Sequence, residues 1–230
     1  MKIQGSIALV TGANRGLGLA FAQALLEAGA AKVYAAARDP SKVTLPRVTP
    51  IKLDITKPAD VAAAARAAGD ATLLVNNAAI ARTVAFLADD AEPALRESLE
   101  TNLFGTLSMI RAFAPVLKAN GGGAIVNMLS IASWLNRPTL AVYAASKSAE
   151  WALTNGTRHE LREQGTLVVG VHAAFIDTDM AKPFQGPKSR PEDIVSQVLA
   201  AVEQGLEEVL ADQLTRDVKR GLSAERASYL

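Results

Sequence analysis

The chain has 230 residues, of which half are apolar and a fifth are charged, with a formal net charge of +1 at pH 7 and no cysteine. This length suits one domain with a sizeable core, and the lack of cysteine excludes disulfides and thiol catalysis. The charges are mixed along the chain, there is no run of about 18 apolar residues, and there is no signal-peptide pattern. We therefore expect a cytoplasmic protein without nucleic-acid or membrane partners.

The first strand is predicted at 6–11 and leads into the glycine-rich turn TGANRGLG (11–18), which opens a helix at 16–28. Gly12, Gly16 and Gly18 allow a tight turn and let the backbone approach a phosphate without an intervening Cβ. The free N–H groups and the positive dipole end of the helix would then face a pyrophosphate. The alternative is a strand–helix turn that binds nothing, and the motifs further along the chain favour the cofactor site.

The end of the second predicted strand (32–37) decides between two nicotinamide cofactors. An acidic residue there would bind the ribose 2′-hydroxyl of NAD, whereas arginine suits the 2′-phosphate of NADP. Ala37 stands where the acidic residue would be expected, and Arg38 follows it. Arg15 offers a second cation for the 2′-phosphate. We therefore predict NADP(H), with NAD(H) less favoured. The alternative is that Asp39 takes the ribose and Arg38 is a solvated charge.

Further elements follow in the same alternation. Strands are predicted at 48–53, 72–76, 124–129, 167–171 and 207–211, and helices at 60–68, within 92–119 and at 140–163. This order predicts an α/β fold, a single Rossmann-like doubly wound parallel sheet of about seven strands with helices on both faces. We expect one dinucleotide-binding and catalytic domain over 1–230. Prolines interrupt 179–191, so this stretch is predicted as a substrate loop rather than a helix.

Tyr143 and Lys147 stand four residues apart on the helix after the fifth strand and therefore share one face. A free tyrosine, with a pKa of about 10, is a poor base at neutral pH, and a neighbouring ammonium favours the phenolate. The hydroxyl can then exchange a proton with a carbonyl or alcohol oxygen. Ser130, at the carboxyl end of the fifth strand, can hydrogen-bond the same oxygen, and this is the edge where such sheets bind ligands. The competing interpretation is a surface Tyr and Lys on an ordinary helix.

Taken together, these motifs resemble the short-chain dehydrogenase/reductase family over essentially the whole chain. The matching segments are TGANRGLG (11–18), LDIT (53–56), NNAA (76–79), ETNLFG (100–105), NMLSIAS (127–133) and YAASK (143–147). The resemblance implies a catalytic set of Ser130, Tyr143, Lys147 and Asn102, in which Lys147 binds the nicotinamide ribose and Asn102 holds a water of a proton relay. It also implies that Asn76 steadies the central sheet.

The resemblance further implies which residues bind the cofactor: Gly12, Asn14, Arg15, Gly16, Leu17, Gly18, Arg38, Asp54, Ile55, Asn77, Ala78, Tyr143, Lys147, Ile176 and Thr178. Asp54 could accept a hydrogen bond from the adenine amine or cap the next turn, and the residues leave both open. The family usually has Pro-Gly after the sixth strand, whereas this chain has Ala173-Ala174. If that glycine uses a positive φ, Ala174 is strained or the loop differs.

Several other residues are expected to be structural. His159 is interpreted as part of a solvated helix face, and His172 as a hydrogen-bonded structural histidine. Trp134 either walls the substrate pocket or packs. No His or carboxylate cluster has metal-ligand spacing, so no metal is expected.

The sequence thus predicts an NADP(H)-dependent carbonyl reductase or alcohol dehydrogenase, with a small carbonyl or alcohol compound as substrate. The alternative from another class is a non-catalytic NADP(H)-binding sensor or interaction protein, which would need neither Ser130 nor Tyr143. A homodimer or homotetramer is expected from the resemblance.

Overall fold

The computed structural model describes residues 1–230 and contains one seven-stranded sheet. The strands are β1 (Ile7–Thr11), β2 (Lys32–Ala37), β3 (Thr49–Lys52), β4 (Leu73–Asn76), β5 (Ala124–Met128), β6 (Leu167–His172) and β7 (Glu208–Leu210). All neighbouring pairs are parallel, in the order β3-β2-β1-β4-β5-β6-β7. The predicted doubly wound parallel sheet is therefore confirmed.

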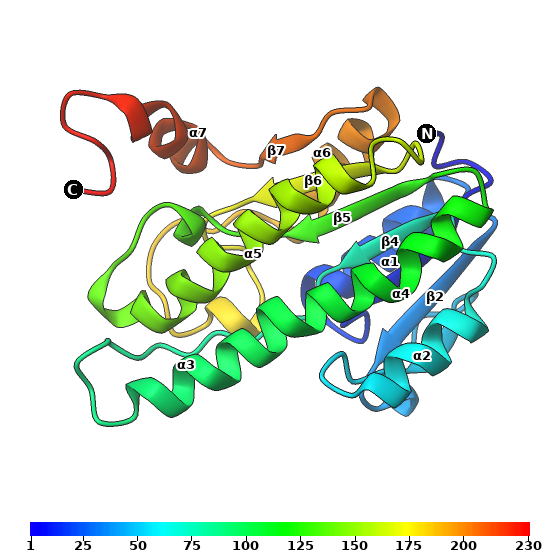
Figure 1. Ribbon diagram of the computed structural model, residues 1–230, viewed down its shortest axis with the longest axis horizontal. Helices are drawn as coiled ribbons and strands as arrows, with labels where there is room; N and C mark the ends of the chain where they lie inside the picture. Colours follow the sequence, from blue (N-terminus) through cyan, green and yellow to red (C-terminus); the bar gives the residue numbers. More distant parts are fainter.

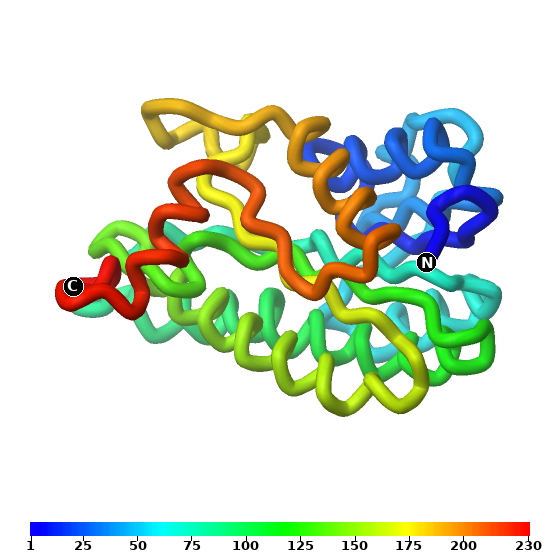
Figure 2. Tube along the Cα trace, turned by 90° about the horizontal axis from the view of Figure 1, so that it is seen from above, coloured from blue at the N-terminus to red at the C-terminus, as the bar shows by residue number.

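Helices cover both faces of this sheet. They are α1 (Gly16–Glu27), α2 (Pro58–Ala67), α3 (Ala91–Leu99), α4 (Thr106–Ala119), α5 (Ala141–Glu160), α6 (Pro191–Gln204) and α7 (Gln213–Arg220). In Figure 1, α2, α4 and α5 lie in front of the strands and α1 and α6 lie behind them. The view from above separates the two layers, with the strands between them (Figure 2). None of the helices combines the length and the apolar character needed to cross a bilayer.

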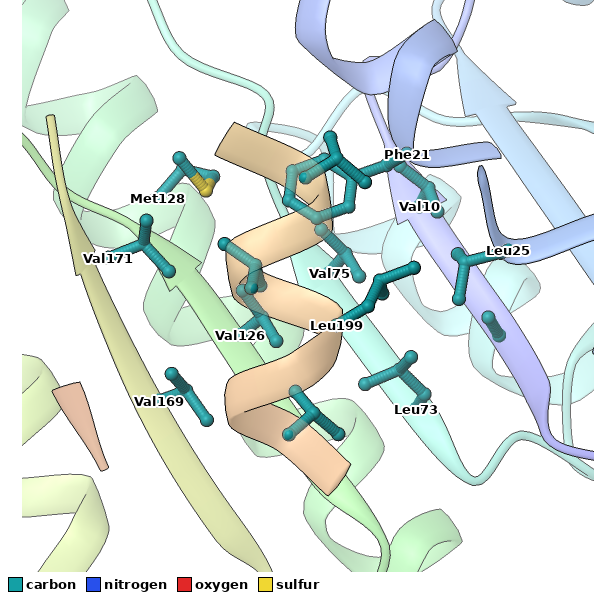
Figure 3. Packing of buried hydrophobic residues seen from close by; sticks show 14 of the residues in the cluster. Val10, Phe21, Leu25, Leu73, Val75, Val126, Met128, Val169, Val171 and Leu199 are labelled. Atoms are coloured by element: carbon teal, nitrogen blue, oxygen red, sulfur yellow. The ribbon is translucent and has the colours of Figure 1, made fainter. Parts of the chain in front are cut away.

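Side-chain alternation along the strands divides the core into two halves. On β1, Ala8 and Val10 pack with α1 and α6, whereas Leu9 packs on the other side with α2 and α4. Figure 3 shows the first half, in which Leu199 of α6 and Phe21 of α1 pack over β-strand valines. Apart from the exposed edge strand β3, both faces are buried, which explains why the strands are almost continuously apolar in sequence.

The strand order reverses between β1 and β4, which opens a crevice at their carboxyl ends. Hydrogen bonds from Thr11 hold this point together: its hydroxyl accepts from the backbone N–H groups of Asn77 and Ala78, both at 2.9 Å. The Asn77 amide in turn donates to the Thr11 carbonyl at 2.9 Å. The switch point between the two halves of the sheet is therefore fixed by polar side chains at the end of β1 and just after β4.

Two irregular segments were partly foreseen. The helical material predicted within 92–119 is α3 and α4 joined through a π-helical turn, η2 (Glu100–Gly105). Residues 179–191 form no long helix: they contain the short 3-10 turn η5 (Asp179–Ala181), and Ser189 forms a bridge with Ile176, which precedes them. The stacked rings of Phe175 and Phe184, with centroids 4.7 Å apart, pack this loop on itself.

Candidate active site

The glycine-rich turn after β1 has the backbone that its sequence requires. Gly12 and Gly16 have φ angles of 66° and 53°, a region that residues with a Cβ rarely adopt. A Cβ on Gly18 would overlap the Gly12 carbonyl oxygen and lie 2.6 Å from the Asn77 amide nitrogen. No side chain caps α1 at Arg15, so the first N–H groups of the helix are not used by a capping residue. The free N–H groups at the start of α1 fit a phosphate group, and the absence of a side chain at Gly18 lets α1 pack closely against the turn and Asn77.

Arg38 and Asp39, after β2, differ in how they are engaged. Arg38 is exposed and makes no hydrogen bond or ion pair. The Asp39 carboxylate accepts from the Ser41 backbone N–H at 3.1 Å and from the Ser41 hydroxyl at 2.7 Å, with Lys42 at 3.7 Å. These Ser41 hydrogen bonds and the Lys42 charge lower the pKa of Asp39. Asp39 is thus committed to the local turn, and Arg38 is the side chain that is available.

Arg15, in the glycine-rich turn, reaches across the crevice to the loop after β6. Its guanidinium lies 2.9 Å from the Asp179 carboxylate, which also pairs with Lys182 at 2.5 Å. The Lys182 and Arg15 hydrogen bonds lower the pKa of Asp179. A Cβ at Gly16 would lie 3.3 Å from the Thr178 methyl group, so Thr178 borders the same turn. The sequence did not anticipate the link between the glycine-rich turn and η5.

Asp54, after β3, caps its own turn. One carboxylate oxygen accepts from the Thr56 backbone N–H at 3.0 Å and from its hydroxyl at 2.7 Å. Burial opposes the charge, but the Thr56 hydrogen bonds and the Arg38 and Lys57 charges outweigh it and lower the pKa of Asp54. The capping role is therefore observed, and the contact with adenine stays a prediction. Ile55 is buried beside η2, where a Cβ on Gly105 would come within 2.8 Å of it.

Ser130 lies just beyond β5 and is 7% exposed. Its hydroxyl accepts from the Ala132 N–H at 3.1 Å, which starts the 3-10 turn η3 (Ile131–Ser133), and lies 3.5 Å from the Ala173 carbonyl. The Ser130 carbonyl is 3.0 Å from Nδ1 of His172. The position of the hydroxyl is thus fixed from both β5 and the segment after β6.

Tyr143 and Lys147 lie on one face of α5, against the end of β5. Tyr143 is half-buried, and Lys147 is 2% exposed. The Lys147 ammonium donates to the Met128 carbonyl at 2.8 Å and to the Glu150 carboxylate at 2.5 Å. Burial disfavours the charge, but Glu150 and Tyr143 outweigh it and raise the pKa of Lys147. Lys147 is therefore held as an ammonium between the tyrosine and a buried carboxylate.

Asn102 lies in the π-helical turn and is fully buried. Its amide nitrogen donates to the Ile80 carbonyl and to the Ser146 hydroxyl, both at 2.9 Å, and its oxygen accepts from the Ile80 N–H at 2.9 Å. The Asn102 side chain thus connects the segment after β4 to α5, where its partner Ser146 directly precedes Lys147. π turns of this kind occur often at functional sites. A solvated surface position is excluded, and the role in a water relay stays a prediction.

The segment after β6 contains Ala173 and Ala174, where the family usually has Pro-Gly. The only non-glycine residue with a positive φ is Arg47, so Ala174 is not strained. Instead, the Ala174 N–H donates to the Asp212 carboxylate at 2.7 Å. Asp212 also caps α7 through the N–H and hydroxyl of Thr215, at 2.8 and 2.9 Å. The C-terminal segment therefore holds the loop in an ordinary backbone conformation.

His172 and Trp134 form a buried stack beside Ser130. Their ring centroids are 3.8 Å apart at 21°, and the Lys219 ammonium lies 4.7 Å from the Trp134 centroid. Burial lowers the pKa of His172 to about 4. His172 is thus a neutral structural residue, as predicted, and Trp134 packs rather than lying open to a ligand. His159 is exposed on α5, also as predicted.

The remaining predicted residues lie along the same crevice. Asn14 and Leu17 are half-buried in the glycine-rich turn, and Ile176 is half-buried after β6. Asn76 donates to Asn127 at 2.9 Å across β4 and β5, which agrees with a role in steadying the sheet. Sequence reasoning missed Glu150, although its spacing of three from Lys147 on a buried helix face was a usable signal.

A separate cavity of about 380 Å³ opens between the segment after β4 and α3. It is lined by Ala81, Arg82, Thr83, Val84, Asp90, Pro93, Ala94 and Glu97. None of the predicted catalytic residues reaches it, so we do not assign it to the reaction.

Comparison with known proteins agrees with this geometry. A family model described as short chain dehydrogenase matches residues 6–188. A short chain dehydrogenase from Aspergillus terreus, tazN, is 36% identical over 208 residues, covering 83% of this chain. The chain spans only 45% of that protein's length. Galactitol 2-dehydrogenase from Agrobacterium fabrum is 33% identical over 201 residues, covering 79% of this chain and 78% of that protein.

A solved structure extends the match to nearly the whole chain. The crystal structure of a short chain dehydrogenase from Burkholderia cenocepacia, in complex with NADP, is 45% identical, with a TM-score of 0.94, and the match covers 98% of this chain and 96% of that one. The family match, the parallel sheet and the order of the motifs agree with one another. The chain therefore belongs to the short-chain dehydrogenase/reductase family.

Proposed function

We propose that this protein is an NADP(H)-dependent oxidoreductase that transfers a hydride between the nicotinamide and a carbonyl or alcohol substrate. One observation carries the proposal: Tyr143 and Lys147 share a face of α5 at the end of β5, where Ser130 lies, at the carboxyl edge of the sheet. This is the edge where a ligand in the glycine-rich cradle would also lie.

The residues of the cradle are those that would hold the cofactor. Gly12 and Gly16 allow the tight turn, and Gly18 lets α1 pack against it, so the free N–H groups at the start of α1 would face the pyrophosphate. Asn77 and Ala78, hydrogen-bonded to Thr11, border the cradle from β4. When bound, the nicotinamide supplies or accepts the hydride.

The protein supplies the proton and the orientation. The Tyr143 hydroxyl gives its proton to the substrate oxygen during reduction and takes it back during oxidation. The Ser130 hydroxyl donates a hydrogen bond to the same oxygen and keeps it beside the tyrosine. The Lys147 ammonium favours the phenolate form of Tyr143 and would also bind the ribose of the cofactor. Asn102 completes the relay that returns the proton from solvent.

The preference for NADP(H) rests on the end of β2. Arg38 is exposed and unpaired, whereas Asp39 is committed to Ser41. A guanidinium suits a 2′-phosphate, and the Burkholderia cenocepacia relative was crystallised with NADP. Arg38→Asp is expected to weaken NADPH binding by tenfold or more and NADH binding far less, since it replaces an attraction by a repulsion. An unchanged preference in cofactor titrations would contradict this assignment.

Loss of turnover in Tyr143→Phe is the test of the reaction itself. Wild type and variant are compared by the absorbance of the reduced nicotinamide, with NADPH and then NADH, against aliphatic and aromatic aldehydes and ketones. We expect turnover by wild type only, with cofactor binding retained in the variant, because the substitution removes a single hydroxyl. Near-normal turnover by Tyr143→Phe would refute the mechanism. Tight cofactor binding without turnover by either protein would favour the sensor.

The assembly stays a separate proposal. We propose a homodimer or homotetramer, which light scattering at micromolar concentration tests directly. A monomeric mass would contradict it.

A further inference from the structure

The catalytic lysine proposed above has an ionic partner within its own helix. Lys147 and Glu150 are separated by three residues, and both side chains are 2% exposed, with the ammonium and the carboxylate 2.5 Å apart. The second Glu150 oxygen lies 3.3 Å from the Thr106 hydroxyl at the start of α4. Because a charge that is buried without a partner is strongly disfavoured, each of these groups depends on the other.

The hydrogen bonds of Lys147 show how its ammonium is oriented. Of its three N–H donors, one goes to the Met128 carbonyl and one to Glu150. The third donor has no partner within the protein. Glu150 therefore limits how far the ammonium can move towards a ligand, because it holds the group against the end of β5 and the start of α4.

The same carboxylate also acts electrostatically on Tyr143. Along the helix axis, the backbone of Lys147 lies about 6 Å and that of Glu150 about 10 Å from that of Tyr143, given a rise of about 1.5 Å per residue. The ammonium favours the phenolate form of the tyrosine, and the carboxylate, one turn further away, opposes this in part.

Few charges other than Lys147 and Glu150 act on Tyr143. His172, at the end of β6, also senses Lys147, but it is neutral above pH 5 because burial lowers its pKa to about 4. The charged residues of α3 and η2, which pack against α5, are exposed to solvent: Glu92, Arg96, Glu97 and Glu100. Burial raises the pKa of Glu150, and Lys147 and Thr106 offset part of this.

We propose that Glu150 is a positioning residue of the reaction centre, one that fixes the Lys147 ammonium and partly cancels its charge at the Tyr143 hydroxyl. The proposal rests on the function proposed above. It makes Glu150 a determinant of the pH range in which the tyrosine exchanges its proton, although the carboxylate does not touch the substrate.

The test is a tyrosinate titration by near-ultraviolet absorbance, which needs neither substrate nor turnover. The chain has three tyrosines, so each protein is compared with its own Tyr143→Phe counterpart, and the difference reports Tyr143 alone. The proteins are wild type, Glu150→Gln and the control Glu160→Gln. Glu160 lies at the exposed end of the same helix, so its substitution removes one negative charge from α5 without touching Lys147.

Glu150→Gln keeps the shape of the side chain and an oxygen to accept from Lys147, but removes the charge. We expect the Tyr143 midpoint to fall by about one pH unit, a tenfold change in the phenolate ratio at fixed pH. Glu160→Gln should leave the Tyr143 midpoint unchanged. An unchanged midpoint in Glu150→Gln, or an equal shift in both variants, would overturn the proposal.

If Glu150→Gln does not fold, Glu150→Asp provides the test. The aspartate side chain is one methylene shorter, which draws the carboxylate away from Lys147, so the Tyr143 midpoint should fall less than in Glu150→Gln, and no fall would overturn the proposal. Where turnover is measurable, the pH profile of alcohol oxidation should move to lower pH in the same variant. Absence of turnover in wild type would count against the proposed function only, because the titration stands without it.

Discussion

His172 should make the stability of this protein depend on pH between about 4 and 6.5. It is fully buried, stacked on Trp134 at 3.8 Å and hydrogen-bonded to the Ser130 carbonyl. Burial lowers its pKa from 6.5 to about 4. The folded state therefore keeps the ring neutral in a range where the unfolded chain binds a proton. As a result, the free energy of unfolding falls as the pH is lowered through this window.

The size of the effect follows from the two pKa values. Each pH unit over which only the unfolded chain binds the proton costs about 1.4 kcal/mol. Between pH 7 and pH 5, His172 then lowers the free energy of unfolding by about 2 kcal/mol. Since the ring is fully buried, solvent screening does not reduce this value much. His172→Asn should remove this component, so that its stability changes less between the two pH values than that of wild type.

Urea unfolding followed by circular dichroism, at fixed protein concentration and ionic strength, measures this difference. His172→Asn loses the stack on Trp134 and is expected to be less stable at both pH values. Only the change between pH 7 and pH 5 is therefore compared. The exposed His159 provides the control, because His159→Asn should keep the pH dependence of wild type. If His172→Asn loses as much stability as wild type between the two pH values, burial of His172 is not the source of the pH dependence.

Two further substitutions, Gly18→Ala and Asp212→Ala, each with a control, test how the site is built. Gly18→Ala should abolish cofactor binding and destabilise the fold, because its Cβ would overlap the Gly12 carbonyl. Gly156→Ala, with open space around it in α5, should stabilise by about 0.5–1 kcal/mol. Thermal unfolding and cofactor titration distinguish Gly18→Ala from Gly156→Ala. A Gly18→Ala protein that binds the cofactor normally would contradict the close contact between Gly18 and Gly12. Asp212→Ala should cost about 2–3 kcal/mol, because it removes a helix cap and leaves the Ala174 N–H without its acceptor. The exposed Asp217 on the same helix provides the control. If Asp212→Ala lowers the free energy of unfolding no more than Asp217→Ala does, Asp212 does not hold the loop after β6.

The fold followed from local patterns in the sequence. Short apolar runs predicted strands within one or two residues of their observed ends, because all strands but the edge strand β3 are largely buried and carry no polar alternation. The glycine-rich turn was equally readable, since Gly12 and Gly16 adopt conformations that few other residues reach. In both cases the information lies in residues adjacent in sequence.

The parts that could not be predicted depend on pairs of residues that only the fold brings together. Asp212 and Ala174 are separated by 38 residues, and nothing near Ala174 indicates that a carboxylate from α7 will satisfy its N–H. The same holds for Arg15 and Asp179, which are 164 residues apart. At Ala173-Ala174 the local sequence lacks the glycine that the family usually has, and the C-terminal segment compensates through Asp212.

Glu150 is the opposite case, because its partner lies three residues away and still passed unnoticed. A glutamate at that spacing from a lysine usually marks a solvent-exposed pair worth a few tenths of a kcal/mol. Here α4 and β5 cover both side chains, and the same spacing places a carboxylate against the lysine that we propose acts on Tyr143. The helical period already assigns Tyr143, Lys147 and Glu150 to one face. If that face carries the reaction, a charged residue on it cannot be an ordinary surface residue, and its effect on Tyr143 should be measurable.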